Sequence, residues 1–374
     1  MIDGRMPLKH MGACAALLLA ILGAGCAPDV EEGPAAEEQI EDPDEGLREA
    51  LRILGLGPGS QASGADQVEA VYADVRRHGV QPDDVEVLGS LQAALLPIEP
   101  DVISPMMLVN TTLALASVTD PIAARAPLKD WTAAHPGAYS AQLSLGHLAL
   151  VLQAAEQSEL YFRAAIESRP GHAKEAYRGL GSVYVQTGRA ELALEALDQA
   201  VEADAEDGST HLQRGSVLMA LQQPDDAVAA WRAAVQQGDA RTRSRAHLRI
   251  GTLMVDRGDH EAALGAFERA LEDDERNPAC SFNLGQLLHF LNRPDEARPQ
   301  LVHSIELRPD YPHAHYLVGE IDEDAGRNAD AEQHYRDALA ADPDHDSARY
   351  RLSLLLRRNG RAEEADRVAA GGDG

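Results

Sequence analysis

A small residue recurs at a nearly fixed spacing through the second half of the chain, and this period strongly limits the possible folds. The positions are Gly146, Gly181, Gly215, Gly251, Gly285, Gly319 and Ser353, separated by 35, 34, 36, 34, 34 and 34 residues. A period of this size indicates one supersecondary unit copied in tandem, which cannot bury its apolar face alone. Stacked neighbours bury that face, so the sequence predicts a solenoid with an extended inner surface.

Each unit reads as two helices joined by a turn. When the recurring Gly is numbered as position eight, position twenty is Ala, position twenty-four is bulky and position twenty-seven is small. Small residues let helices approach closely, and the bulky residue fills the space between them. A Gly or a Pro interrupts the helical pattern in the middle of the unit. The bulky positions are Phe162, Leu197, Trp231, Phe267, Leu301 and Tyr335, and the turns lie at Gly188, Gly258, Gly326 and Gly360 or within 223–225 and 293–295.

This pattern resembles the tetratricopeptide repeat (TPR), a helical hairpin of 34 residues. The copies that begin near Tyr177 and His315 match it best, while Asp322 replaces the aromatic position eleven in one copy. The resemblance implies an all-α fold, a TPR α-solenoid of stacked helix-turn-helix hairpins, over residues 139–374 with a C-terminal cap. Residues 65–138 are predicted to be a helical N-terminal region of degenerate repeats, including one copy that turns at 119–121.

The N-terminus has the pattern of a targeting signal. Residues 1–25 carry Arg5 and Lys9, then an apolar run that is too short to span a membrane, and small residues before Cys26. This arrangement resembles a bacterial lipoprotein signal peptide, which implies cleavage before Cys26 and acylation of Cys26. Several acyl chains anchor a protein stably. The alternative is an uncleaved apolar anchor in which Cys26 occurs by chance.

Residues 26–64 are predicted to form an acidic and Gly-rich tether with a short helix. Nine Asp or Glu and no Lys or Arg lie between Asp29 and Gly46. Such a segment cannot bury a core and is expected to be disordered. After an anchor it reads as a spacer between membrane and folded domain, and the alternative is an acidic interaction tail.

Charge and motif content exclude several function classes. The formal net charge of −28 argues against nucleic-acid binding. The chain has no C-x-x-C or H-E-x-x-H motif. His313 and His315 form an H-x-H pair, with His345 further along, but helical residues two apart do not share a face. We therefore expect no metal, no cofactor and no catalytic residue, and Cys280 is expected to be a packed small residue.

In the family that the chain resembles, the first helix of each unit lines a concave groove. Carried over position by position, this implies a surface suited to a helix or an extended peptide with apolar anchors. The protein partner itself is unknown from sequence. The groove residues so predicted are Arg178, Leu212, Met219, Arg245, Leu248, Phe282, Gln286, His289, Tyr316, Glu320 and Tyr350.

The expected function is a membrane-tethered protein–protein interaction scaffold in the bacterial cell envelope. Ala27 follows Cys26 where an Asp would favour the inner membrane, so the outer membrane facing the periplasm is expected. One alternative is a glycan or small-ligand binder that stacks sugars on Phe282, Tyr316 and Tyr350. Another is an enzyme with its site in 65–138. Four arginines at 241, 243, 245 and 249 form a basic cluster, read either as a solvated junction or as a dock for acidic segments.

Overall fold

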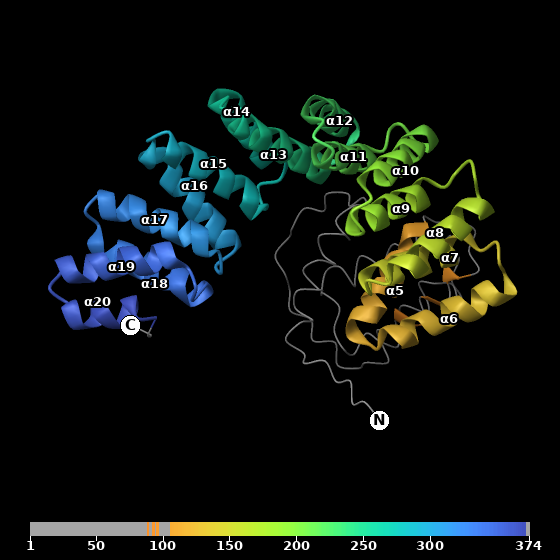
Figure 1. Cartoon of the computed structure of the whole chain (residues 1–374), viewed down its shortest axis with the longest axis horizontal. Coiled ribbons are helices and arrows are strands. Elements are labelled where there is room, and N and C mark those ends of the chain that lie inside the picture. Colours follow the sequence, from red (N-terminus) through yellow and green to blue (C-terminus); the bar gives the residue numbers. More distant parts are fainter. Residues whose placement is uncertain (1–87, 90–91, 94, 97–104, 372–374) are drawn as a thin grey trace, which may run out of the picture. The chain divides into compact units, whose positions relative to one another are not determined.

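The computed structural model describes residues 88–89, 92–93, 95–96 and 105–371 (Figure 1). All regular elements among these residues are helices, which confirms the predicted all-α class. The predicted signal peptide, the acidic tether and most of 65–104 lie outside the described residues. The helices are α5 (Pro105–Val118), α6 (Pro121–Ala134), α7 (Tyr139–Val151), α8 (Ala155–Ser168), α9 (Lys174–Gln186), α10 (Ala190–Ala203), α11 (Gly208–Ala220), α12 (Pro224–Gln237), α13 (Ala240–Asp256), α14 (His260–Asp273), α15 (Pro278–Phe290), α16 (Pro294–Leu307), α17 (Pro312–Asp324), α18 (Asn328–Ala341), α19 (Asp346–Arg358) and α20 (Ala362–Ala369).

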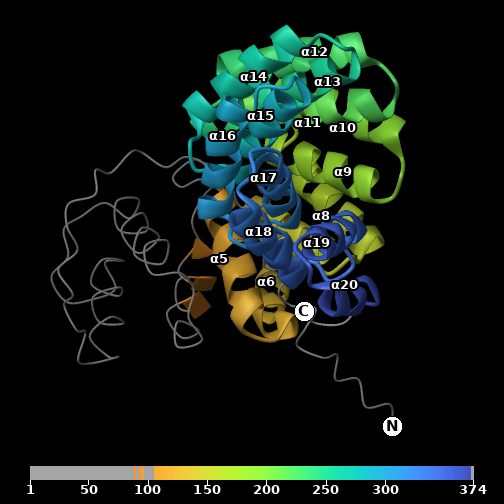
Figure 2. The ribbon, with the colours of Figure 1, turned by 90° about the vertical axis from the view of Figure 1, so that its left-hand side faces the viewer.

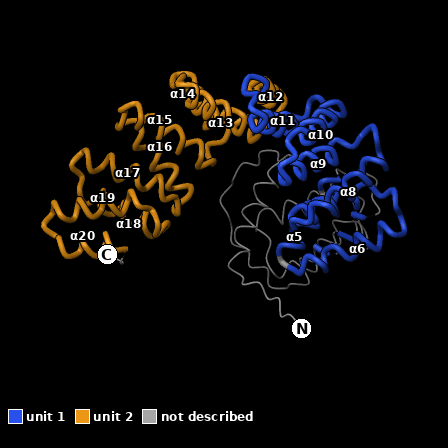
Figure 3. Tube along the Cα trace, in the orientation of Figure 1, with its two compact units in different colours: residues 1–227 blue, residues 228–374 orange. Residues whose placement is uncertain are grey.

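The helices form stacked hairpins in two compact units, residues 1–227 and 228–374 (Figure 3). In the first unit, α5 contacts α6 and α7, α7 pairs with α8, α9 pairs with α10, and α10 contacts α11. In the second unit the pairs are α13 with α14, α15 with α16, α17 with α18 and α19 with α20, and each hairpin contacts the next. Figure 2 looks onto the last two hairpins. The predicted solenoid of stacked helical hairpins is confirmed.

The recurring glycine is the point where the two helices of a hairpin touch. A Cβ atom added at Gly251 would lie 2.5 Å from Phe267, and one added at Gly319 would lie 2.6 Å from Tyr335. These separations are too short for carbon atoms in van der Waals contact, which prefer about 3.5–4.0 Å. The bulky residue at position twenty-four therefore packs directly on the backbone of position eight, which explains the periodic Gly in the sequence.

The turn inside each of these hairpins contains a residue in the left-handed conformation. Four of these residues are glycines, and the other three carry side chains. For an L-residue this conformation costs roughly 1–2 kcal/mol. Each left-handed residue lies seven positions after the recurring Gly or Ser, so the repeats share one turn geometry whatever residue occupies it. The residues are Gln153, Gly188, Gln222, Gly258, Asn292, Gly326 and Gly360.

Helices α5 and α6 form a further hairpin ahead of the regular array. The turn lies at 119–121, where Asp120 accepts a hydrogen bond from the Ile122 amide at 2.8 Å and so caps α6. Ala124 and Leu128 of α6 are fully buried. This hairpin covers the end of the array, since both of its helices contact α7.

Candidate interaction surface on the first helices

The first helices of successive hairpins lie beside one another within each unit. In residues 1–227 α7 contacts α9, and in residues 228–374 α15 contacts α17. Side chains that point away from the second helices therefore share one surface in each unit. The predicted groove residues lie on these helices: Arg178 on α9, Leu212 and Met219 on α11, Arg245 and Leu248 on α13, Phe282, Gln286 and His289 on α15, Tyr316 and Glu320 on α17, and Tyr350 on α19.

In the first unit, the predicted residues also hold the hairpins together. Arg178 donates to Asp207 at 3.1 Å, and Asp207 caps α11 by accepting from the Ser209 amide. Burial raises the pKa of Asp207, but the charge of Arg178 and the hydroxyl of Ser209 outweigh burial and lower that pKa to about 2. Leu212 is buried and Met219 is half-buried. The accessible part of this surface is therefore small.

In the second unit, the apolar members of the predicted set pack in the core. Phe282 is 7% exposed, and its ring centre lies 4.6 Å from that of Tyr311. Leu248 is half-buried and packs against the same hydrophobic cluster. Arg245 and Gln286, in contrast, are exposed. A partner on these helices would thus meet polar side chains above an apolar layer.

Glu320 is the centre of a polar network on α17. It accepts hydrogen bonds from the Tyr316 hydroxyl at 2.7 Å and from Arg351 at 2.6 Å, and His289 lies 3.8 Å away. Burial lowers the pKa of Arg351, but its hydrogen bond to Glu320 outweighs burial and raises that pKa. Tyr350, on the same helix as Arg351, is 64% exposed. The structure therefore links Tyr316, Glu320 and His289 and leaves Tyr350 free for contact.

Asp322 is a fully buried carboxylate in the second unit. Arg298 of the preceding hairpin donates two hydrogen bonds to it, at 2.8 and 3.1 Å, and Arg327 of its own hairpin donates another at 2.8 Å. Burial raises the pKa of Asp322, but the two guanidinium groups outweigh burial and lower that pKa. A buried carboxylate paired in this way is stable only while its partners remain.

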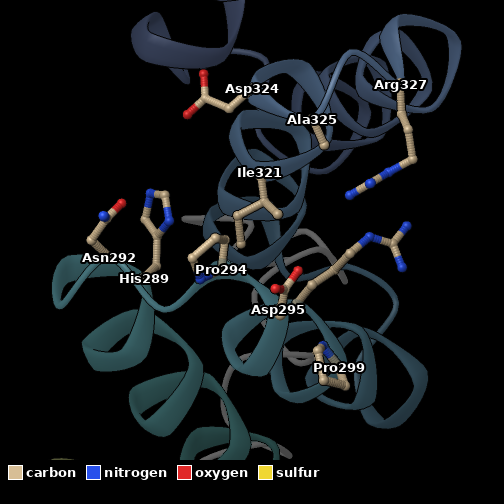
Figure 4. Close-up of a pocket in the computed structure, with 10 residues that line it drawn as sticks. His289, Asn292, Pro294, Asp295, Pro299, Ile321, Asp324, Ala325 and Arg327 are labelled. Atoms are coloured by element: carbon tan, nitrogen blue, oxygen red, sulfur yellow. The ribbon is translucent and has the colours of Figure 1, made fainter.

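A pocket of about 570 Å³ lies between α15, α16 and the end of α17 (Figure 4). In the close-up, His289 and Asn292 stand at one side, Arg327 at the other, and Ile321 and Pro294 between them. Because His289 also belongs to the predicted groove, the pocket extends that surface toward the turns. Its lining residues are His289, Asn292, Pro294, Asp295, Arg298, Pro299, Ile321, Asp324, Ala325 and Arg327.

Comparison with protein families decides the classification. One family model described as "Tetratricopeptide repeat" matches residues 161–208, 212–278 and 319–369. A second model with the same description matches residues 254–321. Together the matched segments exceed half of the chain. The chain belongs to the tetratricopeptide repeat family. No curated protein matches the sequence.

Solved TPR structures resemble the chain in fold. The APC/C Cut9–Hcn1 structure matches with a TM-score of 0.51 and 19% identity, over 85% of this chain and 60% of that one. PilF of Pseudomonas aeruginosa matches with a TM-score of 0.47 and 21% identity, over 52% of this chain and 88% of that one. YrrB, a TPR protein with an unusual peptide-binding site, matches with a TM-score of 0.34 and 20% identity, over 63% of this chain and 99% of that one. At 19% identity the likeness to the Cut9–Hcn1 structure shows the fold alone.

The polar network around Glu323 was missed in the sequence analysis, and the TPR position pattern explains it. Tyr335 fills the bulky position of its repeat, but its hydroxyl donates to Glu323 at 2.8 Å. Arg351 and Arg358 of the next repeat pair with the same carboxylate. The spacing of the charged residues could have indicated this network. An arginine about one repeat after an acidic residue lies at a similar place on the next first helix, and so close to that acidic residue.

Two further features of the TPR array are the environment of Cys280 and the character of its helices. Cys280 is fully buried, with its sulfur 3.4 Å from the Ser244 hydroxyl, and burial raises the pKa of its thiol. It is thus a packed residue, as expected. Among the described helices, none combines the length and the apolar character that crossing a membrane requires.

Proposed function

We propose that this TPR protein is a scaffold of the bacterial cell envelope, held at a membrane by acylated Cys26. The TPR fold supports a protein–protein interaction scaffold. The fold is also generally non-catalytic. The membrane anchor and the outer-membrane location facing the periplasm come from the N-terminal pattern and belong to the proposal.

The proposed binding surface rests on one observation, the exposure of side chains on the first helices. On the first helices of the second unit, Arg245, Gln286 and Tyr350 are exposed, and His289 and Tyr316 are half-buried beside them. Exposed aromatic and arginine side chains over a packed apolar layer are the composition typical of binding hot spots. A helix or extended peptide with acidic and apolar residues is the partner that this surface fits.

The alternative of a glycan binder is less well supported. It needs Phe282, Tyr316 and Tyr350 as stacking platforms, but Phe282 is buried and Tyr316 is half-buried against Tyr335 and His345. Tyr350 is the exposed ring of the three. A single ring on an open surface offers little area for a sugar.

The alternative of an enzyme in residues 65–138 has little support from the described part of that region. The ionisable residues of α5 and α6 are Arg125, Lys129 and Asp130, of which the last two are exposed. The acidic residues Asp83, Asp84 and Asp101 lie outside the described residues.

Partner capture tests the binding surface. The full chain, cross-linked in its native envelope and purified, is expected to carry a stoichiometric protein. The variant Arg245→Glu should lose it, because the substitution reverses a charge on the proposed surface. The control is Arg269→Glu, which makes the same change at an exposed position of a second helix, α14. Equal capture by both variants would contradict the proposal.

The anchor needs a separate test. Cys26→Ser is expected to abolish incorporation of a labelled fatty acid and to move the protein out of the membrane fraction. Cys14→Ser, in the apolar run before the cleavage point, is the matched control and should keep both. If Cys26→Ser remains labelled and in the membrane fraction, the lipoprotein assignment is wrong, and the binding-surface test still stands.

A further inference from the structure

Three metal-binding side chains meet inside the hairpin α17–α18. His315 comes from α17, and His334 and Asp337 come from α18. One ligand atom of each lies within 4.8 Å of the others. His334 and Asp337 are three residues apart on a helix and so share a face. His315 is buried, and the other two are half-buried. The cluster is therefore fixed on its inner side and accessible on its outer side.

The surroundings of His315 set which of its nitrogens is free. Its Nε2 lies 2.9 Å from the carbonyl oxygen of Pro309. A carbonyl only accepts hydrogen bonds, so Nε2 carries the proton and the neutral ring presents the lone pair of Nδ1 to the cluster. A histidine whose other nitrogen donates to a backbone carbonyl is the usual arrangement of a metal ligand.

His334 faces His315 through the same type of nitrogen. The two Nδ1 atoms are 3.2 Å apart. On the far side of the ring, Nε2 of His334 lies 3.9 Å from the buried carboxylate of Asp322, whose charge favours a proton on that nitrogen. With the proton there, both Nδ1 atoms offer a lone pair to the space between the rings, and a metal ion can take the place that a shared proton would otherwise fill.

Asp337 supplies the third ligand atom. Its Oδ1 accepts a hydrogen bond from Gln333 at 2.8 Å, which orients the carboxylate. Its Oδ2 lies 4.0 Å from Nδ1 of His315. The carboxylate is 38% exposed, so solvent reaches this side of the cluster. A small rotation of the side chain brings Oδ2 closer to both rings.

We propose that His315, His334 and Asp337 bind one Zn²⁺ ion, with a water molecule as the fourth ligand. Zinc takes imidazole and carboxylate ligands in a tetrahedron at about 2.0–2.2 Å, which places two ligating nitrogens about 3.3 Å apart. The separation of 3.2 Å between the histidines matches this spacing. Bound in this way, the ion cross-links the two helices of one repeat and stabilises that repeat.

The neighbouring histidine pair is a built-in control. His313 and His345 are 2.9 Å apart, but Nδ1 of His345 accepts a hydrogen bond from the Ala348 amide and caps α19. Its Nε2 is then the donor to His313, so His345 has no free lone pair. This pair cannot bind zinc without losing the helix cap, although His313 lies only two residues from His315.

Calorimetric titration of the metal-free full chain with ZnCl₂ tests the site, with MgCl₂ as the comparison. We expect one saturable Zn²⁺ site and a rise in the thermal midpoint, since a ligand that binds the folded state stabilises it. His334→Ala and Asp337→Asn are the test variants because both side chains are partly exposed, whereas replacing buried His315 disturbs folding. Loss of a direct ligand should weaken Zn²⁺ by more than the roughly 10–100-fold typical of outer-shell changes, the range expected for Gln333→Ala.

His313→Ala should keep the Zn²⁺ affinity of the unmodified chain. Substituted Co²⁺ should give the strong visible absorption of a tetrahedral site, and His334→Ala should lose it. Absence of saturable Zn²⁺ binding would overturn the proposal. So would an affinity that is unchanged in His334→Ala, or one that is lost in His313→Ala.

Discussion

The contact between the periodic glycine and the bulky residue makes a sharp prediction. Gly251→Ala adds a Cβ atom 2.5 Å from the ring of Phe267, so the ring must move. Gly265→Ala adds the same atom in the paired helix α14, where nothing lies within 4 Å. Both glycines are inside helices of one hairpin, which makes the two variants a matched pair.

The expected magnitudes follow from two opposing effects. Replacing Gly by Ala inside a helix stabilises by roughly 0.5–1 kcal/mol. Forcing extra volume into a packed site costs about 1–3 kcal/mol. Gly265→Ala therefore has only the stabilising effect of alanine in a helix. Gly251→Ala has this effect and also the cost of the extra volume. We expect Gly265→Ala to raise the free energy of unfolding, and Gly251→Ala to fall about 1–3 kcal/mol below it.

Urea unfolding followed by circular dichroism measures this difference. Repeat arrays often unfold in more than one step, so the transition of the second unit is fitted separately. Native-state hydrogen exchange of α13 and α14 amides reports the same difference locally. If the two variants shift stability equally and in the same direction, the close approach at Gly251 is not what the repeat requires.

Three further outcomes are expected. Gln222→Gly should stabilise by up to about 1–2 kcal/mol in urea unfolding because the residue is left-handed, whereas Gly258→Ala at the same turn position should destabilise. Burial and the charge of Arg178 lower the pKa of His147 to about 4. Below about pH 6.5 the unfolded state therefore binds a proton that the folded state does not, and stability should fall by about 1.4 kcal/mol per pH unit down to about pH 4, a dependence that His147→Gln removes. Replacing both Arg298 and Arg327 by Ala should cost about 3–5 kcal/mol by thermal or urea unfolding, because it leaves the buried Asp322 carboxylate without either guanidinium partner.

The sequence was sufficient to predict the repeat fold because the same pattern of small and bulky residues recurs along the array. The position of Gly251 is small in every copy, and the position of Phe267 is bulky in six of the seven copies. The turn residues were harder to predict. Gln222 and Asn292 adopt the left-handed conformation that Gly258 adopts, but the sequence pointed to the proline that follows each of them. The conformation comes from the hairpin and not from the residue.

The candidate sites depend on side-chain partners, which a sequence pattern shows less clearly. The H-x-H pair drew attention to His313 and His315, and these residues do face different neighbours. The partners His334 and Asp337 lie on the paired helix, where no short motif marks them. In the same way, the burial of Phe282 depends on Tyr311, in the turn that leads into the following hairpin. The groove residues stay a prediction that the partner-capture experiment tests.

The ion pairs of Asp322 have a consequence for how this array can change over time. Arg298 belongs to one hairpin, and Asp322 and Arg327 belong to the next. A duplication or deletion that separated these neighbours would leave the buried Asp322 carboxylate with Arg327 as its remaining arginine partner. We expect an exchange of modules at this junction to cost more stability than one at a junction without a buried ion pair. Rearrangement of these two modules is therefore expected to be less favourable than keeping their order.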